Sequence, residues 1–398
     1  MHEAGDVTGD GDDPTGPRAP SLGGIAREWT RLGCLGFGGP PTHIAMLRRL
    51  CVDERRWIAA QEFEDGVAAT NLLPGPASTQ LAIFCAWRLR RTAGAIVGGV
   101  CFILPGLVLI LALSAVFLSS HPPSWILGAA AGAGAAVPAV ALNAASGFIP
   151  ASRERIGAAK RSQARWLVYA LCGVVAAAVA GPYLALVLVG CGLTEIVIRR
   201  ERRRPPPTTA VVAGTAGHAV TIGGLAALGW TAFKVGALSY GGGFVIVPLM
   251  QHDAVTAYHW MTGTQFLGAV ALGQVTPGPV VLTVAVVGYA ARGVRGGLVA
   301  AVIAFTPSFL FVIVGAPRFD RMRANPSMRA FLTGAGPAAI GAIGGSAVPL
   351  GLALAHPWQV PVLAAATVLL FAARRSVVTV LVLAAATGAA LALAGVTP

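Results

Sequence analysis

Two Pro-Gly-Pro motifs carry most of the chemistry that this sequence offers. The first lies in Asn71-Leu-Leu-Pro-Gly-Pro-Ala-Ser-Thr-Gln80, and the second lies in Gln274-Val-Thr-Pro-Gly-Pro279. Proline has no backbone N–H and disfavours helical geometry in the residue before it, so each motif is predicted to end one helix and begin another. The first turn of a helix exposes backbone N–H groups and the positive end of the helix dipole. Each motif therefore predicts a place where an anion binds.

Neutral hydrogen-bond donors surround the two motifs, and they suit an oxyanion better than a metal cation, which would need carboxylates. Glycine runs at Gly36-Phe-Gly-Gly39 and Gly241-Gly-Gly243 interrupt the preceding segments. Because glycine has no side chain, it leaves backbone N–H groups uncovered and lets a ligand approach closely. His43 and His252, beside polar or basic turns, are expected at the membrane interface rather than in a site.

Two cations, Arg31 and Lys234, lie 203 residues apart (234 − 31 = 203), as the two motifs do (277 − 74 = 203). An ionisable residue inside a membrane is costly, so this pair is expected to help hold a divalent anion. The alternative is that both side chains extend to the membrane surface. The residues that we expect to contact the substrate are Arg31, Gly38, Gly39, Asn71, Pro74, Gly75, Pro76, Ser78, Thr79, Gln80, Lys234, Gly241, Gly242, Gly243, Gln274, Thr276, Pro277, Gly278, Pro279 and Thr283.

The composition places these motifs in a membrane protein. Of the 398 residues, 55% are hydrophobic and 11% are charged, and the mean hydropathy is +0.72. The net charge of +13 (29 − 16) would indicate nucleic acid in a soluble protein, but here the arginines lie between apolar segments, where they set topology. We therefore expect the lipid bilayer as a partner and no nucleic acid. Four uncharged stretches are long enough to cross a membrane as helices: Ala93–Leu118, Ser124–Pro150, Gly296–Pro317 and Ala330–Ala355. Such long apolar stretches exclude a transmembrane β-barrel.

The sequence repeats itself at an offset of 203 residues. Beyond the Pro-Gly-Pro motifs, the offset matches Gly38-Gly39 with Gly241-Gly242 and several aromatic residues with one another. The pattern predicts two homologous halves of about six elements each. Their expected bounds are 21–204 and 225–398, joined by a basic, proline-containing linker at 205–224 that begins an extra span, and residues 1–20 are expected to form a disordered tail. The aromatic pairs at this offset are Trp57 and Trp260, Phe63 and Phe266, and Phe102 and Phe305.

The charged links between apolar segments reverse their order from one half to the other. In the first half an uncharged link, 119–123, precedes a basic one, 153–165, whereas in the second half a basic link, 318–323, precedes the neutral 355–357. By the positive-inside rule the halves cross the membrane in opposite senses. The sequence thus predicts an all-α polytopic membrane protein built as an inverted-topology repeat with broken helices and roughly ten to thirteen transmembrane segments.

With these motifs in view, the sequence resembles the chromate ion transporter family in its two-domain, long form. The resemblance rests on Phe37-Gly-Gly-Pro40, the two Pro-Gly-Pro motifs and Tyr240-Gly-Gly-Gly-Phe-Val-Ile-Val-Pro248, and it covers nearly everything after residue 21. It implies an inner-membrane transporter that exports chromate, with sulfate as a structural mimic. In one departure, many relatives carry Glu or Asn directly after the first Pro-Gly-Pro, where this chain has Ala77.

The function that we expect is secondary-active efflux of chromate across the inner (plasma) membrane, which would confer chromate resistance. The inside-negative potential would assist it, because each outward negative charge gains about 2.3 kcal/mol per 100 mV. The alternative is a sulfate or other small-anion transporter on the same scaffold. No GxxxxGK[ST] motif is present, and the six scattered cysteines form no CxxC pair, so we expect no enzyme activity, no catalytic residue, no cofactor and no metal. A homodimer is compatible with the sequence.

Overall fold

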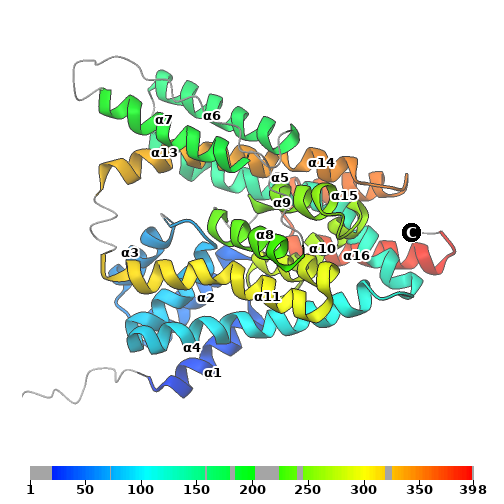
Figure 1. The fold of residues 1–398 in the computed structure, drawn as a ribbon, viewed down its shortest axis with the longest axis horizontal. Coiled ribbons are helices and arrows are strands. Elements are labelled where there is room, and N and C mark those ends of the chain that lie inside the picture. The colour runs from blue at the N-terminus through cyan, green and yellow to red at the C-terminus, as the bar shows by residue number, and fades with distance from the viewer. Residues whose placement is uncertain are drawn as a thin grey trace, which may run out of the picture.

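The computed structural model describes residues 20–71, 73–156, 159–179, 184–201, 224–239, 245–318 and 325–396. Within these residues every regular element is a helix. The expected tail lies outside them apart from Pro20, and so do Gly241, Gly242 and Gly243. Figure 1 shows an elongated helical bundle in which α4 and α11 run side by side along one flank, while α6, α7 and α13 run along the other.

The helices of the first half begin at Leu22 and end at Glu201. Polar caps fix where some helices of the chain begin, as at α1, where Ser21 Oγ accepts from Gly24 N at 3.1 Å. The elements are α1 (Leu22–Leu35), α2 (Pro40–Arg48), the π-helix η1 (Arg49–Glu54), α3 (Ala60–Thr70), α4 (Ala77–Phe117), α5 (Ser124–Ile156), α6 (Lys160–Val179) and α7 (Leu184–Glu201).

The second half follows the same order of elements. A capping box between Thr262 and Gln265 begins α10, and Asn325 caps α13 with Pro326 at its first position. The elements are α8 (Leu225–Leu238), α9 (Ile246–Gln251), the π-helix η3 (His252–Ala257), α10 (Gly263–Val275), the 3-10 helix η4 (Val280–Leu282), α11 (Thr283–Gly315), the 3-10 helix η5 (Ala316–Arg318), α13 (Pro326–Gly345), α14 (Ala347–Leu352), α15 (Gln359–Phe371) and α16 (Val377–Leu393).

Irregular backbone features recur at the sequence offset. The two π-helices begin 203 residues apart (252 − 49). Arg56 and His259, also 203 apart, both have φ of 51°. Gly75 and Gly278, the central glycines of the two Pro-Gly-Pro motifs, have φ of 125° and 102°, a region that favours glycine. Local backbone geometry therefore follows the same period as the motifs.

The predicted helix breaks at the Pro-Gly-Pro motifs are confirmed. In the first half α3 ends at Thr70 and α4 begins at Ala77. In the second half α10 ends at Val275 and η4 begins at Val280. Both helices that follow the motifs are buried in their first turns, so each break lies inside the protein.

Each of α4 and α11 reverses direction part-way along its length. Non-helical dihedral angles interrupt α4 at Arg90 and Arg91, and interrupt α11 at Arg292 and Gly293. In a straight helix Ala86 and Gly98 would lie about 18 Å apart, at 1.5 Å per residue. Instead, a Cβ placed on Gly98 would overlap the Cβ of Ala86. The Pro-Gly-Pro motifs thus begin short helices that end at a tight turn, and a longer helix returns from that turn.

Four described stretches are long and apolar enough to cross a membrane by length and composition. They lie at Ala77–Phe117, Ser124–Glu154, Val280–Gly315 and Pro326–Leu352. Because α4 and α11 turn back on themselves, the portion able to cross is the one after each turn. The chain is thus a polytopic, all-helical membrane protein in its described part, and the larger number of spans expected from the sequence stays a prediction.

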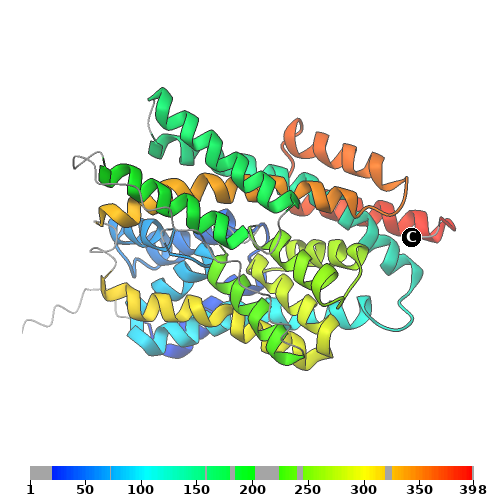
Figure 2. The ribbon, with the colours of Figure 1, turned by 45° about the horizontal axis from the view of Figure 1, so that its top comes forward.

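The longest uninterrupted helix of each half packs on the last two helices of the other half. α5 contacts α15 and α16, and α13 contacts α6 and α7, as Figure 2 shows for α13. Glycines allow these close approaches: a Cβ on Gly132 of α5 would overlap the carbonyl oxygen of Ala384, and a Cβ on Gly341 of α13 would overlap that of Ala170. Small residues at helix contacts are the usual means of close packing in a membrane, where no hydrophobic effect drives helices together.

Replacing Gly132 with leucine is expected to lower the free energy of unfolding by about 1–3 kcal/mol, because the side chain would force α16 away from α5. The matched control is Gly147→Leu on the same helix, where an added Cβ meets nothing within 4 Å. Thermal unfolding of both purified variants in detergent measures the difference. Equal melting temperatures for the two variants would contradict the close packing of α5 on α16.

Candidate functional site

Two hydrogen bonds join the helix breaks of one half to those of the other. Gly75 N donates to Ser239 O at 2.6 Å, and Gly278 N donates to Gly36 O at 3.0 Å. Both donors and both acceptors are related by the offset of 203 (278 − 75 and 239 − 36). Gly36 and Ser239 directly follow the ends of α1 and α8, where helix carbonyls lack partners within the helix. All four breaks therefore meet in one part of the protein.

His43 strengthens this junction in the first half. Its Nε2 lies 2.8 Å from Gly36 O and its Nδ1 lies 3.2 Å from Ser78 Oγ. A carbonyl oxygen only accepts, so Nε2 carries a proton, and in the neutral imidazole Nδ1 accepts from the Ser78 hydroxyl. His43 is 1% exposed, so it lies inside the protein, and its expected position at the membrane interface stays a prediction. The ring packs inward against Phe102, with centroids 5.1 Å apart, because α2 follows a break and lies against α4.

Two cavities adjoin the breaks. The glycine cavity, of about 240 Å³, is bordered by the start of α2, the middle of α5, the end of α10 and the start of η4. The α3–α13 cavity, of about 80 Å³, is bordered by the end of α3, the Gly75 turn, α5 and α13. Phe148 of α5 lines both cavities. None of the described residues that line either cavity carries a charged side chain.

Several residues predicted from the sequence line these cavities. Gly38, Gly39 and Gln274 line the glycine cavity, whereas Asn71 and Gly75 line the α3–α13 cavity. Gln274 is 8% exposed, and its Nε2 has no hydrogen-bond partner among the described residues. A buried donor without a partner costs about 1–3 kcal/mol, so Gln274 is available to a ligand.

The other polar residues of the motifs are buried, and most hydrogen-bond within their own half. Gln80 Nε2 donates to Pro74 O at 2.7 Å, while Thr79 Oγ1 has no partner among the described residues. The hydroxyls of Thr276 and Thr283 donate to backbone carbonyls three or four residues earlier, each at 2.8 Å. The remaining prolines shape the turns: Pro76 and Pro279 precede α4 and η4 as caps, and the carbonyl of Pro277 lies against Gly106.

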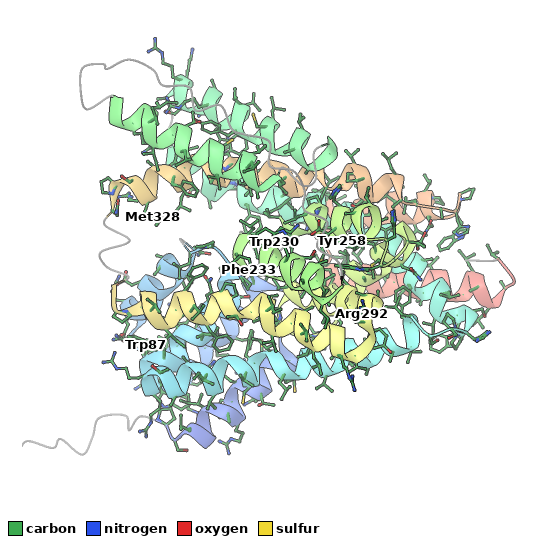
Figure 3. All side chains as sticks on the ribbon, viewed as in Figure 1. Trp87, Trp230, Phe233, Tyr258, Arg292 and Met328 are labelled. Carbon is green, nitrogen blue, oxygen red and sulfur yellow. The ribbon has the colours of Figure 1, made fainter. Side chains whose placement is uncertain are left out.

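The two predicted cations lie in ion pairs and line neither cavity. Lys234 Nζ lies 2.6 Å from Asp253 Oδ2, which also accepts from Thr231 Oγ1 at 2.7 Å. Lys234 also lies over the ring of Trp230, which is labelled in Figure 3. Arg31 lies 3.8 Å from Glu28, and its side chain is 69% exposed. Contact of either cation with the substrate stays a prediction.

Asn143 of α5 also lines the glycine cavity, and it was not among the residues predicted from the sequence. Its side chain makes no hydrogen bond to the part of the chain that the structure describes, and it is half-buried. The sequence does mark this position, because Asn143 is the one carboxamide in the uncharged stretch Ser124–Pro150. A polar side chain inside a membrane helix is costly and marks a functional position more often than a surface one does.

Comparison with known proteins agrees with this architecture. The sequence model of the family described as Chromate transporter matches residues 24–196 and 226–390. The chromate transport protein of Cupriavidus metallidurans is 32% identical over 87% of this chain and 86% of its own length. A probable chromate transport protein of Synechococcus elongatus is 29% identical over 85% and 86%, and an uncharacterized transporter of Methanocaldococcus jannaschii is 27% identical over 77% and 78%. No solved structure matches the chain. Since the family match spans most of the chain and both halves, the chain belongs to the chromate transporter family.

Proposed function

We propose that this chain is a secondary-active exporter of chromate across the inner membrane and that it confers chromate resistance. The observation that carries the proposal is the pair of hydrogen bonds that join Gly75 to Ser239 and Gly278 to Gly36. They bring four helix ends together beside two uncharged cavities, where helix N-termini favour an anion. The names of relatives, which are chromate transport proteins, support chromate as the anion.

The scaffold of this exporter is an inverted-topology repeat with halves at 21–204 and 225–398 and a linker at 205–224. The recurrence of the π-helices, the positive φ angles and the cross-half hydrogen bonds at an offset of 203 supports the repeat. The reversal of basic and neutral links supports the inversion. Inverted repeats allow a transporter to exchange the roles of its two halves around a fixed site.

The contact between α5 and α10 is closed, whereas the equivalent contact between α13 and α3 is open. Alternating access requires such a difference between the two halves. In the closed contact, α10 packs on α5, and a Cβ on Gly134 would lie 3.0 Å from the Cβ of Leu267. The counterpart of Gly134 in α13 is Gly336, 202 residues later (336 − 134), within the same Gly-Ala-Gly sequence. A Cβ on Gly336 meets nothing within 4 Å, and Gly336 lines the α3–α13 cavity. Transport then closes α3 on α13 and parts α10 from α5.

The α3–α13 cavity opens toward the cytoplasm in this state. Ser152 and Ile156, which line it, lie beside the basic link that contains Arg153, Lys160 and Arg161. By the positive-inside rule that link is cytoplasmic. Substrate therefore enters from the side from which an exporter must load.

Chromate uptake into inside-out vesicles from cells that express the chain tests this function. We expect uptake to grow with an imposed potential that is positive inside the vesicles, because the anion is drawn to that side. Vesicles from cells with an empty vector are the control, and excess sulfate tests whether sulfate competes. Uptake equal to that of the control vesicles would overturn chromate export, whereas sulfate uptake alone would replace the substrate and leave the transporter.

Whether Lys234 contacts the substrate, as the sequence predicts, can be tested apart from its role in the ion pair with Asp253. Lys234→Met alone leaves a buried carboxylate unpaired and is expected to cost about 3–5 kcal/mol of stability. The double variant Lys234→Met, Asp253→Leu is expected to recover most of that loss, measured by thermal unfolding. If the stable double variant also transports chromate at the wild-type rate, Lys234 does not bind the substrate.

A further inference from the structure

We propose that the glycine cavity binds the oxyanion without any cationic side chain, through the backbone N–H groups of Gly38 and Gly39 and the carboxamides of Gln274 and Asn143. This inference rests on the proposed transport of an oxyanion and names the groups that hold it. A cavity of about 240 Å³ is several times the roughly 30 Å³ that one water occupies in the liquid, so a tetrahedral oxyanion fits inside it.

The beginning of α2 supplies the first two donors. Gly38 and Gly39 have φ of 100° and 76°, and neither N–H donates a hydrogen bond within the described part of the chain. The next two residues, Pro40 and Pro41, have no N–H at all, so the two glycines carry most of the free donors of this helix end. A Cβ on Gly39 would meet nothing within 4 Å, so the space beside it is open to a ligand.

Gln274 supplies the third donor from the other half of the chain. It lies at the end of α10, one residue before the helix stops, and it is 92% buried (100 − 8). Its Nε2 has no partner among the described residues. Gln274 borders the glycine cavity, which the N-terminus of α2 also borders. An unpaired donor at such a place is satisfied when an anion occupies the cavity.

Asn143 supplies the fourth donor from α5, a helix that packs on α10. Its carboxamide lies on the wall that α5 contributes to the glycine cavity. The position equivalent to Asn143 in α13, at the 202 offset of the Gly-Ala-Gly sequences (345 − 143), is Gly345, which has no side chain to offer. At this position of the described chain, the donors of the two halves are therefore unequal.

The absence of cations from the described lining has a consequence for transport. A divalent oxyanion held only by neutral groups keeps its full charge while it is bound. Each transported chromate then carries two negative charges across the membrane, and the membrane potential acts on both of them. A lysine or arginine in the pocket would offset the charge of the anion during the crossing step, but it would return with the empty carrier and would not change the net charge moved per chromate.

Binding of chromate to the purified full-length protein in lipid nanodiscs, measured by calorimetry, tests the pocket. Gln274→Leu and Asn143→Leu are each expected to raise Kd at least tenfold. Gln163→Leu, which removes an exposed carboxamide from α6, is the matched control and is expected to keep the wild-type Kd. If a leucine variant fails to fold, the near-isosteric Gln274→Glu and Asn143→Asp replace it, and their new negative charge is expected to abolish binding.

The outcomes separate the pocket from the function. Wild-type Kd values in folded Gln274 and Asn143 variants would overturn the pocket, while chromate transport by the wild-type protein would leave the exporter in place. Wild-type protein that neither binds nor transports chromate would overturn both.

Discussion

The structure depends on a rule of buried backbone: every N–H and C=O that leaves a helix inside the protein needs a partner. Pro-Gly-Pro breaks create such unpaired groups in both halves, and each half supplies partners for the other. The glycine N–H of one motif donates to the carbonyl that follows the broken helix of the opposite half. Because Gly75 and Gly278 adopt positive φ to make these bonds, glycine is needed at both positions. The halves are thus joined beside the cavities where we propose that an anion binds.

The helix breaks could be predicted from the sequence, because proline and glycine act on the local backbone and the motifs recur with one period. The reversal of α4 at Arg90 and Arg91 could not be predicted, since no glycine or proline marks it and Arg91 takes a φ of 50°. Only the packing of Gly94 and Gly98 against Ala86 reveals the turn. Local signals therefore gave the breaks, and tertiary packing decided which helices turn back.

The lining of the glycine cavity could be predicted in part for the same reason. Gly38, Gly39 and Gln274 border one cavity because they flank breaks, which the sequence displays. Lys234 was expected to face the substrate, yet its nearest anion is Asp253, 19 residues away in sequence, through the packing of α8 on the π-helix η3. The burial of His43 likewise depends on α2 folding back toward α4. Pairing across elements requires three-dimensional information that spacing does not carry.

A pocket of neutral donors suits a transporter, which must release its ligand as well as bind it. A permanent positive charge in a cavity of low dielectric would hold a divalent anion strongly and slow its release. Carboxamides and helix N-termini bind more weakly and leave the membrane potential to drive the movement. The ion pairs of Lys234 and of Arg31 are consistent with a neutral pocket, because they hold both positive charges beside carboxylates rather than in the cavities.

The central claim, that the two halves exchange roles, is tested most directly by the accessibility of Gly336 and Gly134. Each is replaced by cysteine in a chain whose own six cysteines are changed to serine, and a membrane-impermeant maleimide is added to inside-out vesicles. Without substrate, Gly336→Cys should be labelled and Gly134→Cys protected. In right-side-out vesicles the reagent reaches the opposite face of the membrane. When sulfate and an imposed potential are added to these vesicles, labelling of Gly134→Cys should rise and labelling of Gly336→Cys should fall. Equal labelling of both positions under every condition would contradict the account.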